Sequence, residues 1–302
     1  MDNTLISIVG PTAIGKTALS IALAQHYRTE IISADSRQFY KEMRIGTAVP
    51  STSELASAPH HFIQHKSIEE AYSVGDFEKE AIALLEKKFQ EHQLLIMVGG
   101  SGLYVDAVVK GLDEFPSVPA KVRTSLNTLL EKEGIAALQQ RLKVLDPEYY
   151  KSVDLGNPHR LIRALEVCIA SNKPYSSFRK KEKKNRSFHT ITIGLTAERP
   201  IIYDRVNQRV DIMMDQGLLH EAESLRNHRH LNALQTVGYK ELFAYFDKIY
   251  DLETAIGEIK KNTRRFSKRQ MTWFKKNEDT IWIDYQTDVS AAIAKIEQQL
   301  TS

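Results

Sequence analysis

Residues 10–17, Gly-Pro-Thr-Ala-Ile-Gly-Lys-Thr, constrain the fold of this chain more than any other segment. They have the spacing of a phosphate-binding loop, in which backbone N–H groups surround an anion, a lysine adds charge and a hydroxyl group can reach Mg²⁺. An apolar run at 4–9 precedes the loop and a helical pattern follows it, so a helix N-terminus would add its partial positive charge. We therefore predict a di- or triphosphate site here, with Thr17 as the Mg²⁺ ligand.

The wider pattern predicts an α/β fold. Five β-type runs occur at 4–9, 30–33, 94–98, 189–195 and 280–284, and helical patterns separate them. Most of these runs are continuously apolar, as expected for strands that are covered on both faces. We predict a parallel sheet flanked by helices, of the type found in P-loop NTPases.

The middle of the chain differs from the rest. From 115 to 187 no strand pattern is present, and helical patterns occupy 120–132, 134–143 and 157–171. We therefore predict a catalytic core formed by 1–114 and 188–302, interrupted by an all-helical insertion at 115–187. The last third is again helical, at 199–216, 218–227, 238–247 and 252–276.

Composition narrows the class of protein. The single cysteine, Cys168, excludes a disulfide within the chain, which favours a reducing compartment. The first residues lack the basic and apolar regions of a signal peptide, and no apolar run approaches the length of a membrane span. We expect a cytoplasmic protein without a membrane partner.

The net charge of +3 conceals two basic blocks, at 179–186 and 260–276. Either block alone would be read as a solvated face. Two of them in a chain with a phosphate-binding loop indicate a polyanionic partner.

Two further loops carry candidate chemistry. Asp35 follows the second strand, at the edge of a parallel sheet where ligands bind, and could act as a general base, hold Mg²⁺ through water or cap a helix. Gly99, Gly100 and Ser101 follow the third strand, where a P-loop NTPase usually has a Mg²⁺-binding aspartate. The glycines there either permit close approach of a ligand or backbone, or serve a turn with positive φ.

Two helices add candidate residues. Arg205 and Arg209 are one turn apart and could bind a phosphate or pair with acids. The helix over 259–274 has an apolar stripe that we assign to the core, with its basic side facing RNA. The stripe consists of Ile259, Phe266, Trp273 and Phe274. His60 and His61 have no metal-ligand spacing, so we predict no metal besides Mg²⁺.

The motifs together resemble those of tRNA dimethylallyltransferases. The matching segments are 10–17, 32–40, 59–63, 72–77, 99–104, 160–166, 237–239 and 264–273, in family order over most of the chain. Ser101 stands where the family usually has threonine, and His159 where glutamine is common. The resemblance implies transfer of a dimethylallyl group from its diphosphate to the exocyclic amine of the adenine on the 3′ side of the tRNA anticodon.

The resemblance also implies roles for individual residues. Asp35 would take the proton from the amine. The leaving diphosphate would be stabilised by Lys16, Thr17 with Mg²⁺, Ser101 and Arg209. The diphosphate-binding residues would be Gly10, Pro11, Thr12, Ala13, Ile14, Gly15, Lys16 and Thr17. The tRNA-binding residues would be Asp35, Ser36, Arg37, Gln38, Ser101, Arg123, His159, Arg160, Leu161, Ile162, Arg163, Gln235, Gly238, Tyr239 and Lys240.

Three other functions remain open at this point. A small-molecule kinase would have a similar loop and fold, an enzyme that prenylates free AMP or ATP would have a similar core, and a non-enzymatic RNA-binding module would use the basic blocks alone. The insertion and the basic blocks favour RNA over a free nucleotide, and the phosphate-binding loop favours an enzyme over a simple binding module. We expect a monomer whose partners are dimethylallyl diphosphate and the anticodon stem–loop of tRNA.

Overall fold

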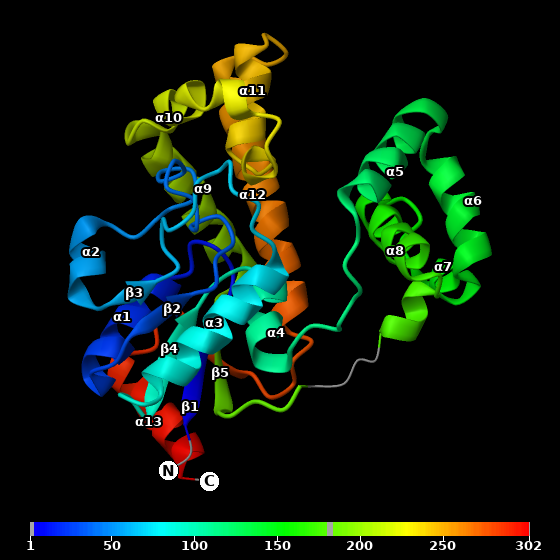
Figure 1. Cartoon of the computed structure of the whole chain (residues 1–302). Helices are drawn as coiled ribbons and strands as arrows, with labels where there is room; N and C mark the ends of the chain where they lie inside the picture. The colour runs from blue at the N-terminus through cyan, green and yellow to red at the C-terminus, as the bar shows by residue number, and fades with distance from the viewer. Residues whose placement is uncertain (1–2, 180–183, 302) are drawn as a thin grey trace. The chain divides into compact units, whose positions relative to one another are not determined.

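The computed structural model describes residues 3–179 and 184–301 (Figure 1). These residues contain one six-stranded sheet with the order β3-β2-β4-β1-β5-β6. All of its strand pairs are parallel. The strands are β1 (Thr4–Val9), β2 (Ile31–Ser33), β3 (His60–His61), β4 (Leu94–Val98), β5 (His189–Thr196) and β6 (Ile281–Asp284). The predicted α/β fold with a parallel sheet is confirmed.

Nine helices pack around this sheet or extend from the segments that join its strands, in the part of the chain that the structure describes. They are α1 (Lys16–Tyr27), α2 (Thr52–Ser57), α3 (Val74–Lys88), α4 (Gly102–Lys110), α9 (Arg199–Asp215), α10 (Leu218–Ser224), α11 (Tyr239–Phe246), α12 (Leu252–Phe274) and α13 (Val289–Leu300). Short 3₁₀ turns lie at Arg226–His228 and Asn232–Leu234. Among the described residues, no helix has the combination of length and apolar character that a bilayer span requires.

Strand β1 is fully buried because helices cover both faces of the sheet. On one face, Ile6 and Ile8 pack in a cluster with residues of α1, α9 and α13. On the other face, Leu5 and Val9 pack with residues of α3 and α4. The alternation of side chains along one strand therefore supplies two hydrophobic layers.

The strand order brings three loops to one edge of the sheet. Strand β1 pairs with β4, and β4 pairs with β2, so the segment after β4 lies between the segments that follow β1 and β2. These three segments are the phosphate-binding loop, Gly99–Ser101 and the segment that begins at Asp35. Carboxyl ends of parallel strands are where ligands bind in such sheets.

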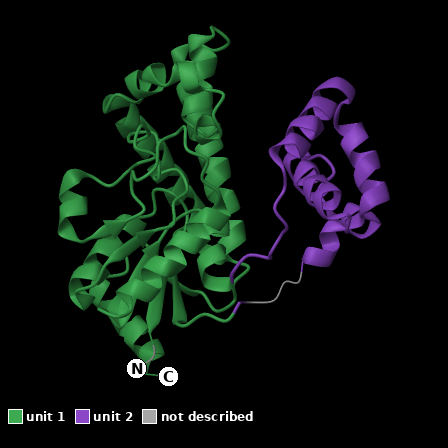
Figure 2. Cartoon of the chain, in the orientation of Figure 1, with its two compact units in different colours: residues 1–110, 185–302 green, residues 111–184 purple. Residues whose placement is uncertain are grey.

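The chain divides into two compact units (Figure 2). Unit 1 comprises Met1–Lys110 and Asn185–Ser302, and unit 2 comprises Gly111–Lys184. The insertion predicted from sequence ran from 115 to 187, so its boundaries lie close to those of unit 2. Unit 2 contains α5 (Ala120–Glu133), α6 (Ile135–Leu145), α7 (Pro147–Ser152), α8 (Pro158–Ser171) and a 3₁₀ turn, η1 (Tyr175–Phe178).

Unit 2 has its own hydrophobic core, in which Leu126, Leu138, Leu142 and Leu161 are almost completely buried. Asp146 caps α7 by accepting a hydrogen bond from the backbone N–H of Tyr149 at 2.9 Å. Its other oxygen accepts the N–H of Ser176 at 2.7 Å, which fixes η1 to the start of α7. The buried carboxylate of Asp146 therefore has hydrogen-bond donors on both of its oxygens. These hydrogen bonds hold α7 and η1 together and stabilise unit 2.

Candidate active site

The phosphate-binding loop has the backbone that its sequence demands. Gly10 and Gly15 have φ values of 146° and 111°, which side chains with a Cβ rarely adopt. A Cβ on Gly10 would also lie 2.6 Å from the carbonyl oxygen of Leu195 in β5. The loop then enters α1 at Lys16, so the loop amides and the N-terminus of α1 face the same space.

Lys16 lies over the loop, where its Nζ donates a hydrogen bond to the carbonyl oxygen of Pro11 at 2.8 Å. Burial lowers the pKa of Lys16 to about 7, and nearby Arg209 acts in the same direction while Asp35 opposes it. A diphosphate would supply the negative charge that a buried ammonium group requires.

Asp35 is the carboxylate of this site. Its Oδ1 accepts the backbone N–H of Arg37 at 3.2 Å. Burial raises its pKa, against the opposing effects of that hydrogen bond, of Lys16 and of two arginines. A carboxylate with a raised pKa is a stronger proton acceptor, which suits a general base.

Ser101 connects the segment after β4 to the segment after β2. Its Oγ accepts the backbone N–H of Ser36 at 3.0 Å and lies 3.0 Å from the Oγ of Ser36. Ser101 therefore orients the residue next to Asp35 in this structure. Because it accepts this N–H through a lone pair, its hydroxyl can still donate to an anion when Ser36 donates in the contact between the two hydroxyl groups.

The glycines after β4 are required by close approach and not by a turn with positive φ. A Cβ on Gly99 would lie 2.4 Å from the carbonyl oxygen of Ala34, and a Cβ on Gly100 would lie 2.3 Å from Nε2 of Gln270. Neither glycine has positive φ. Of the two interpretations left open by the sequence, close packing of neighbouring chain segments is the one that the geometry supports.

The arginine pair of α9 faces the phosphate-binding loop. Arg209 Nη1 donates to Oγ1 of Thr12 at 3.3 Å, and Arg205 Nε donates to the carbonyl oxygen of Ala13 at 2.8 Å. Burial lowers the pKa of Arg209, an effect that Asp35 opposes. Both arginine side chains therefore contact the loop that would bind the anion.

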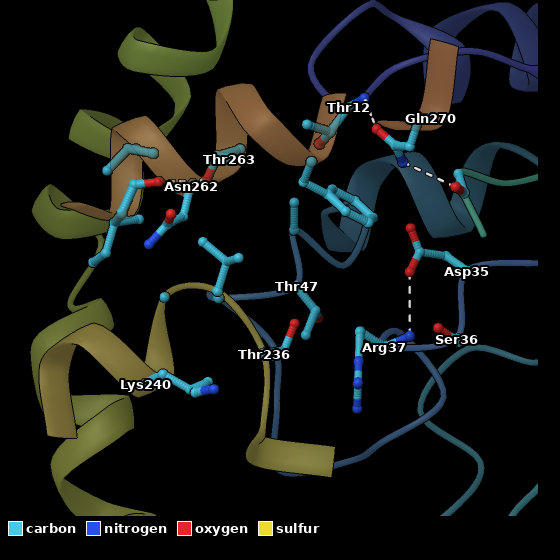
Figure 3. A pocket seen from close by; sticks show the side chains of 18 of the residues that line it. Thr12, Asp35, Ser36, Arg37, Thr47, Thr236, Lys240, Asn262, Thr263 and Gln270 are labelled. Atoms are coloured by element: carbon cyan, nitrogen blue, oxygen red, sulfur yellow. Dashed lines mark hydrogen bonds between the residues drawn. The ribbon is translucent and has the colours of Figure 1, made fainter. Parts of the chain in front are cut away.

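Two cavities meet at these residues. Figure 3 shows side chains that line the larger one. The smaller cavity, about 670 Å³, contains Lys16, Thr17 and the rest of the loop from Thr12 onward. The larger cavity, about 820 Å³, is lined by Ser36, Arg37 and Ser101, and also by Gln235, Thr236, Val237, Gly238 and Lys240. Residues that line both cavities are Thr12, Asp35, Thr47, Ala48, Arg209, Met213, Phe266 and Gln270.

Most of the RNA-binding residues predicted in unit 1 surround the larger cavity. Arg37 Nη1 donates to the carbonyl oxygens of Asn232 and Ala233, both at 2.9 Å, and so reaches the segment that leads to Gln235. Gln38 Nε2 donates to the carbonyl oxygens of Thr47 and Ala48 at 3.2 and 2.9 Å. Gln38 therefore supports the cavity wall.

Tyr239 requires a correction to its predicted role. Its side chain is fully buried and its hydroxyl donates to Glu221 at 2.7 Å, so no part of it is available to RNA in this structure. Gly238, with φ of 98°, begins α11, and its N–H is bound by Glu241 at 2.8 Å. Gln235 and Lys240 remain exposed.

In unit 2, the predicted RNA-binding residues divide into two groups. His159 and Arg160 are exposed, whereas Leu161 and Ile162 are buried in the core of unit 2. The prediction that Leu161 and Ile162 bind RNA is therefore corrected, because their side chains are not accessible to it in this structure. Arg123 Nη2 donates to Oε2 of the buried Glu166 at 2.8 Å, and Arg163 lies 3.8 Å from the same carboxylate. Glu166 thus holds two of the candidate arginines.

Several basic side chains of the two blocks at 179–186 and 260–276 form ion pairs with acidic residues of this chain. In the first, residues 180–183 lie outside the described residues, and Arg186 is mostly buried with an ion pair to Glu78 at 2.8 Å. In the second, Lys260 pairs with Asp211 at 2.6 Å and Lys261 with Glu258 at 2.7 Å.

Sequence comparison identifies the group to which this chain is related. A model of the family described as IPP transferase matches residues 38–277. The chain belongs to this family. It is 62% identical over 304 residues to a protein from Flavobacterium johnsoniae named tRNA dimethylallyltransferase, covering 99% of this chain and 98% of the relative. It is 59% identical to the protein of the same name from Christiangramia forsetii, over the full length of both.

Solved structures of IPP transferase relatives have the same fold. The full-length tRNA isopentenylpyrophosphate transferase from Bacillus halodurans aligns with a TM-score of 0.72 and 37% identity, covering 99% of this chain and 96% of that chain. A eukaryotic dimethylallyltransferase described as acting on tRNA aligns with a TM-score of 0.82 and 26% identity, covering 99% of this chain and 77% of that one.

Four residues in or next to this IPP transferase site were not predicted to have the roles that the structure gives them. Gln270 and Glu221 make hydrogen bonds to segments far away in the sequence, which no local pattern announces. Phe266 was assigned to the core, but its side chain is 38% exposed and lines both cavities. Trp273, also assigned to the core, is 36% exposed beside the larger cavity, whereas Ile259 and Phe274 are buried as predicted.

One other cluster among the described residues has donor atoms close enough for a metal, namely Glu30, Glu91 and His92. The Nζ of Lys88 lies 2.9 Å from Glu30 and 3.0 Å from Glu91. The ammonium group of Lys88 therefore already lies against both carboxylates, and we assign no metal to them.

Proposed function

We propose that this chain transfers the dimethylallyl group of dimethylallyl diphosphate to the exocyclic amine of the adenine on the 3′ side of the anticodon in tRNA, releasing diphosphate. The observation that carries the proposal is the pair of cavities with Asp35 on their common wall. The printed names of the relatives supply the substrate class.

The smaller cavity suits the diphosphate. It combines the loop amides and α1 N-terminus with the side chains of Lys16 and Arg209. Fixed positive groups in a partly buried space stabilise the charge that develops on a leaving diphosphate, and such stabilisation is commonly the largest single contribution to catalysis.

The larger cavity suits the adenine. Polar side chains at its rim, among them Arg37 and Lys240, can contact RNA, and its volume of about 820 Å³ is of the size that accommodates a small ligand. The base would have to leave its stack to enter, at a cost of about a few kcal/mol.

The reaction then takes place at the common wall. The amine nitrogen forms a bond to C1 of the dimethylallyl group, and the bond from C1 to the diphosphate oxygen breaks with its electron pair going to the diphosphate. The amine proton passes to the Asp35 carboxylate. Thr12 and Arg209, which also line both cavities, would hold the leaving oxygens in place.

Mg²⁺ fits the donors of the smaller cavity, because Thr17 offers a hydroxyl oxygen and the donor diphosphate offers anionic oxygens. Mg²⁺ usually keeps several waters and uses few protein ligands beside substrate phosphates. When bound, it would neutralise part of the charge on the diphosphate. We assign it to Thr17, and we keep the cytoplasm and a monomeric state as parts of the proposal.

The test is a transfer assay with the purified chain, Mg²⁺, an unmodified tRNA and dimethylallyl diphosphate. Mass spectrometry of the digested tRNA should show a prenylated adenosine at the position next to the anticodon. Transfer of the γ-phosphate of ATP to a metabolite, with no prenylated tRNA, would identify a kinase instead. Prenylation of free AMP but not of tRNA would identify the free-nucleotide class.

A further inference from the structure

Gln270, on α12, connects two loops that are far apart in the sequence. Its Oε1 accepts the backbone N–H of Thr12 at 2.9 Å, and its Nε2 donates to the carbonyl oxygen of Gly100 at 2.9 Å. The side chain is only 5% exposed. Both ends of one amide are therefore used, one on the phosphate-binding loop and one on the segment after β4 (Figure 3).

A glutamine suits this pair of contacts better than the side chains most similar to it in size. The two partners are a backbone donor and a backbone acceptor, so the bridging group needs one acceptor and one donor on a short planar group. A glutamate cannot donate when ionised, a methionine of similar length offers no strong donor or acceptor, and an asparagine is shorter by one methylene group.

Gly100 is fitted to this amide. A Cβ at residue 100 would lie 2.3 Å from Nε2 of Gln270, and Gly100 has no positive φ that would itself demand glycine. The absence of a side chain at residue 100 is thus explained by the space that the Gln270 amide occupies.

The hydrogen bonds continue beyond Gln270 on both sides. On the loop side, Oγ1 of Thr12 accepts a hydrogen bond from Arg209 at 3.3 Å. On the other side, Ser101, next to Gly100, binds the backbone of Ser36, which follows Asp35. One buried amide therefore sits between the residues assigned to the diphosphate and the residues assigned to the base.

We propose that Gln270 is a positioning residue that fixes the phosphate-binding loop against the Gly99–Ser101 segment and so sets the distance between the leaving diphosphate and the acceptor amine. This inference rests on the proposed function. Each cavity can still bind its ligand when the bridge is lost, but the two reacting groups lose their alignment. Misplacement by about 1 Å can cost about 100-fold in rate.

One variant and a matched control test the proposal. Gln270→Met keeps the length of the side chain and removes both hydrogen bonds, and Gln90→Met makes the same exchange at an exposed position. We expect Gln270→Met to lower kcat about 10- to 100-fold. The separately measured affinities for inorganic pyrophosphate and for tRNA should stay within about threefold of the wild type, a difference below 1 kcal/mol.

A double-mutant cycle tests the fit between Gln270 and Gly100. Gly100→Ala alone should lower kcat as much as Gln270→Ala, because the new methyl group displaces the amide. In the Gln270→Ala background it should cost no more than about threefold, since the space is then vacant. Fully additive effects would overturn the proposal, as would a Gln270→Met variant with wild-type kcat.

Hydrogen exchange of the Thr12 amide gives a readout that does not need the reaction. It should be protected in the wild type and exchange faster in Gln270→Met, with Gln90→Met unchanged. Unchanged Thr12 exchange would overturn the bridge even in an inactive enzyme. Faster exchange with loss of both ligand affinities would show a general structural role and also overturn positioning. Failure of wild-type transfer, by contrast, would count against the proposed function.

Discussion

The hydroxyl of Tyr239 donates a hydrogen bond to Oε1 of Glu221 at 2.7 Å. The same carboxylate accepts the backbone N–H groups of Arg44, Ile45 and Gly46 at 2.9, 2.8 and 2.9 Å. Burial and this carboxylate raise the pKa of Tyr239. Glu221 therefore joins the segment before the cavity wall at Thr47 and Ala48 to the start of α11.

Glu221→Gln should destabilise the protein. A glutamine has one acceptor oxygen for four donors, and its NH₂ group would face backbone N–H groups. We expect a loss of about 1–3 kcal/mol in the free energy of unfolding, measured by urea titration. Glu223→Gln, at an exposed position of the same helix, is the matched control and should change stability by no more than about 0.5 kcal/mol. Equal stability of Glu221→Gln and Glu223→Gln would contradict the conclusion that the hydrogen bonds of Glu221 stabilise the fold.

Asp35→Asn should remove the base while preserving the shape of the site. General base catalysis contributes about 10²–10⁴-fold, so the rate constant measured under single-turnover conditions should fall by that factor. Affinity for tRNA should remain close to that of the wild type, because an asparagine can still accept the N–H of Arg37. A variant that keeps near-wild-type kcat would show that another group takes the proton.

Asp35 also gives a pH dependence with a defined sign. Burial raises its pKa, and only the ionised carboxylate can accept the proton. The rate should therefore fall as pH drops through this raised pKa, and the profile should move upward from the pH expected for an ordinary aspartate. A pH–rate profile of kcat/KM, which reports ionisations of the free enzyme, measures this shift. The acidic limb should be absent from the residual activity of Asp35→Asn.

Lys16 should couple binding of diphosphate to proton uptake. Its pKa is lowered to about 7 in the free protein, and a bound anion raises it. The contribution of the Lys16 charge to pyrophosphate binding is complete below pH 7, and it is lost as the pH rises from 7 toward the higher pKa of Lys16 in the complex. In that range the affinity for pyrophosphate should weaken by up to about tenfold per pH unit. Calorimetry should show this slope in the wild type but not in Lys16→Arg, because ionisation of the ligand is common to both. Parallel slopes would contradict it.

Substitutions of Arg160 and Arg123, both in unit 2, should have different effects on tRNA binding and on stability. Arg160 is exposed, so Arg160→Ala should weaken tRNA binding, reduce the salt dependence by about one phosphate contact and leave stability unchanged. Arg123→Ala leaves the buried Glu166 without its bidentate partner, and should also lower the melting temperature. Filter binding at several salt concentrations and thermal unfolding separate the two. A stable Arg123→Ala variant would show that the ion pair contributes little.

Local patterns were sufficient to predict the phosphate-binding loop and five of the six strands that the structure describes. Continuous apolar runs gave the strands at 4–9 and 94–98 with the bounds that the structure has. Strand β3 was missed because two residues carry no periodicity. Helix α13 was also missed, although Ala292 and Ile296 have the spacing of a buried helical face.

The candidate site was harder to predict because its supports depend on distant partners. Asp35 and Ser101 could be found from their positions after strands, since parallel strands bring such loops together. Gln270 binds residues 258 and 170 positions away, and α12 gives no local sign of either partner. The exposure of Phe266 depends on whether another element covers that face of α12, which helical spacing does not specify.

The most direct test of the central claim is a crystal structure of the chain with an anticodon stem–loop and a non-reactive dimethylallyl thiolodiphosphate. The account predicts the diphosphate on the amides of loop 10–17 and the adenine in the larger cavity, with its exocyclic amine within hydrogen-bonding distance of Asp35. A diphosphate bound outside that loop, or an adenine whose amine points away from Asp35, would contradict it.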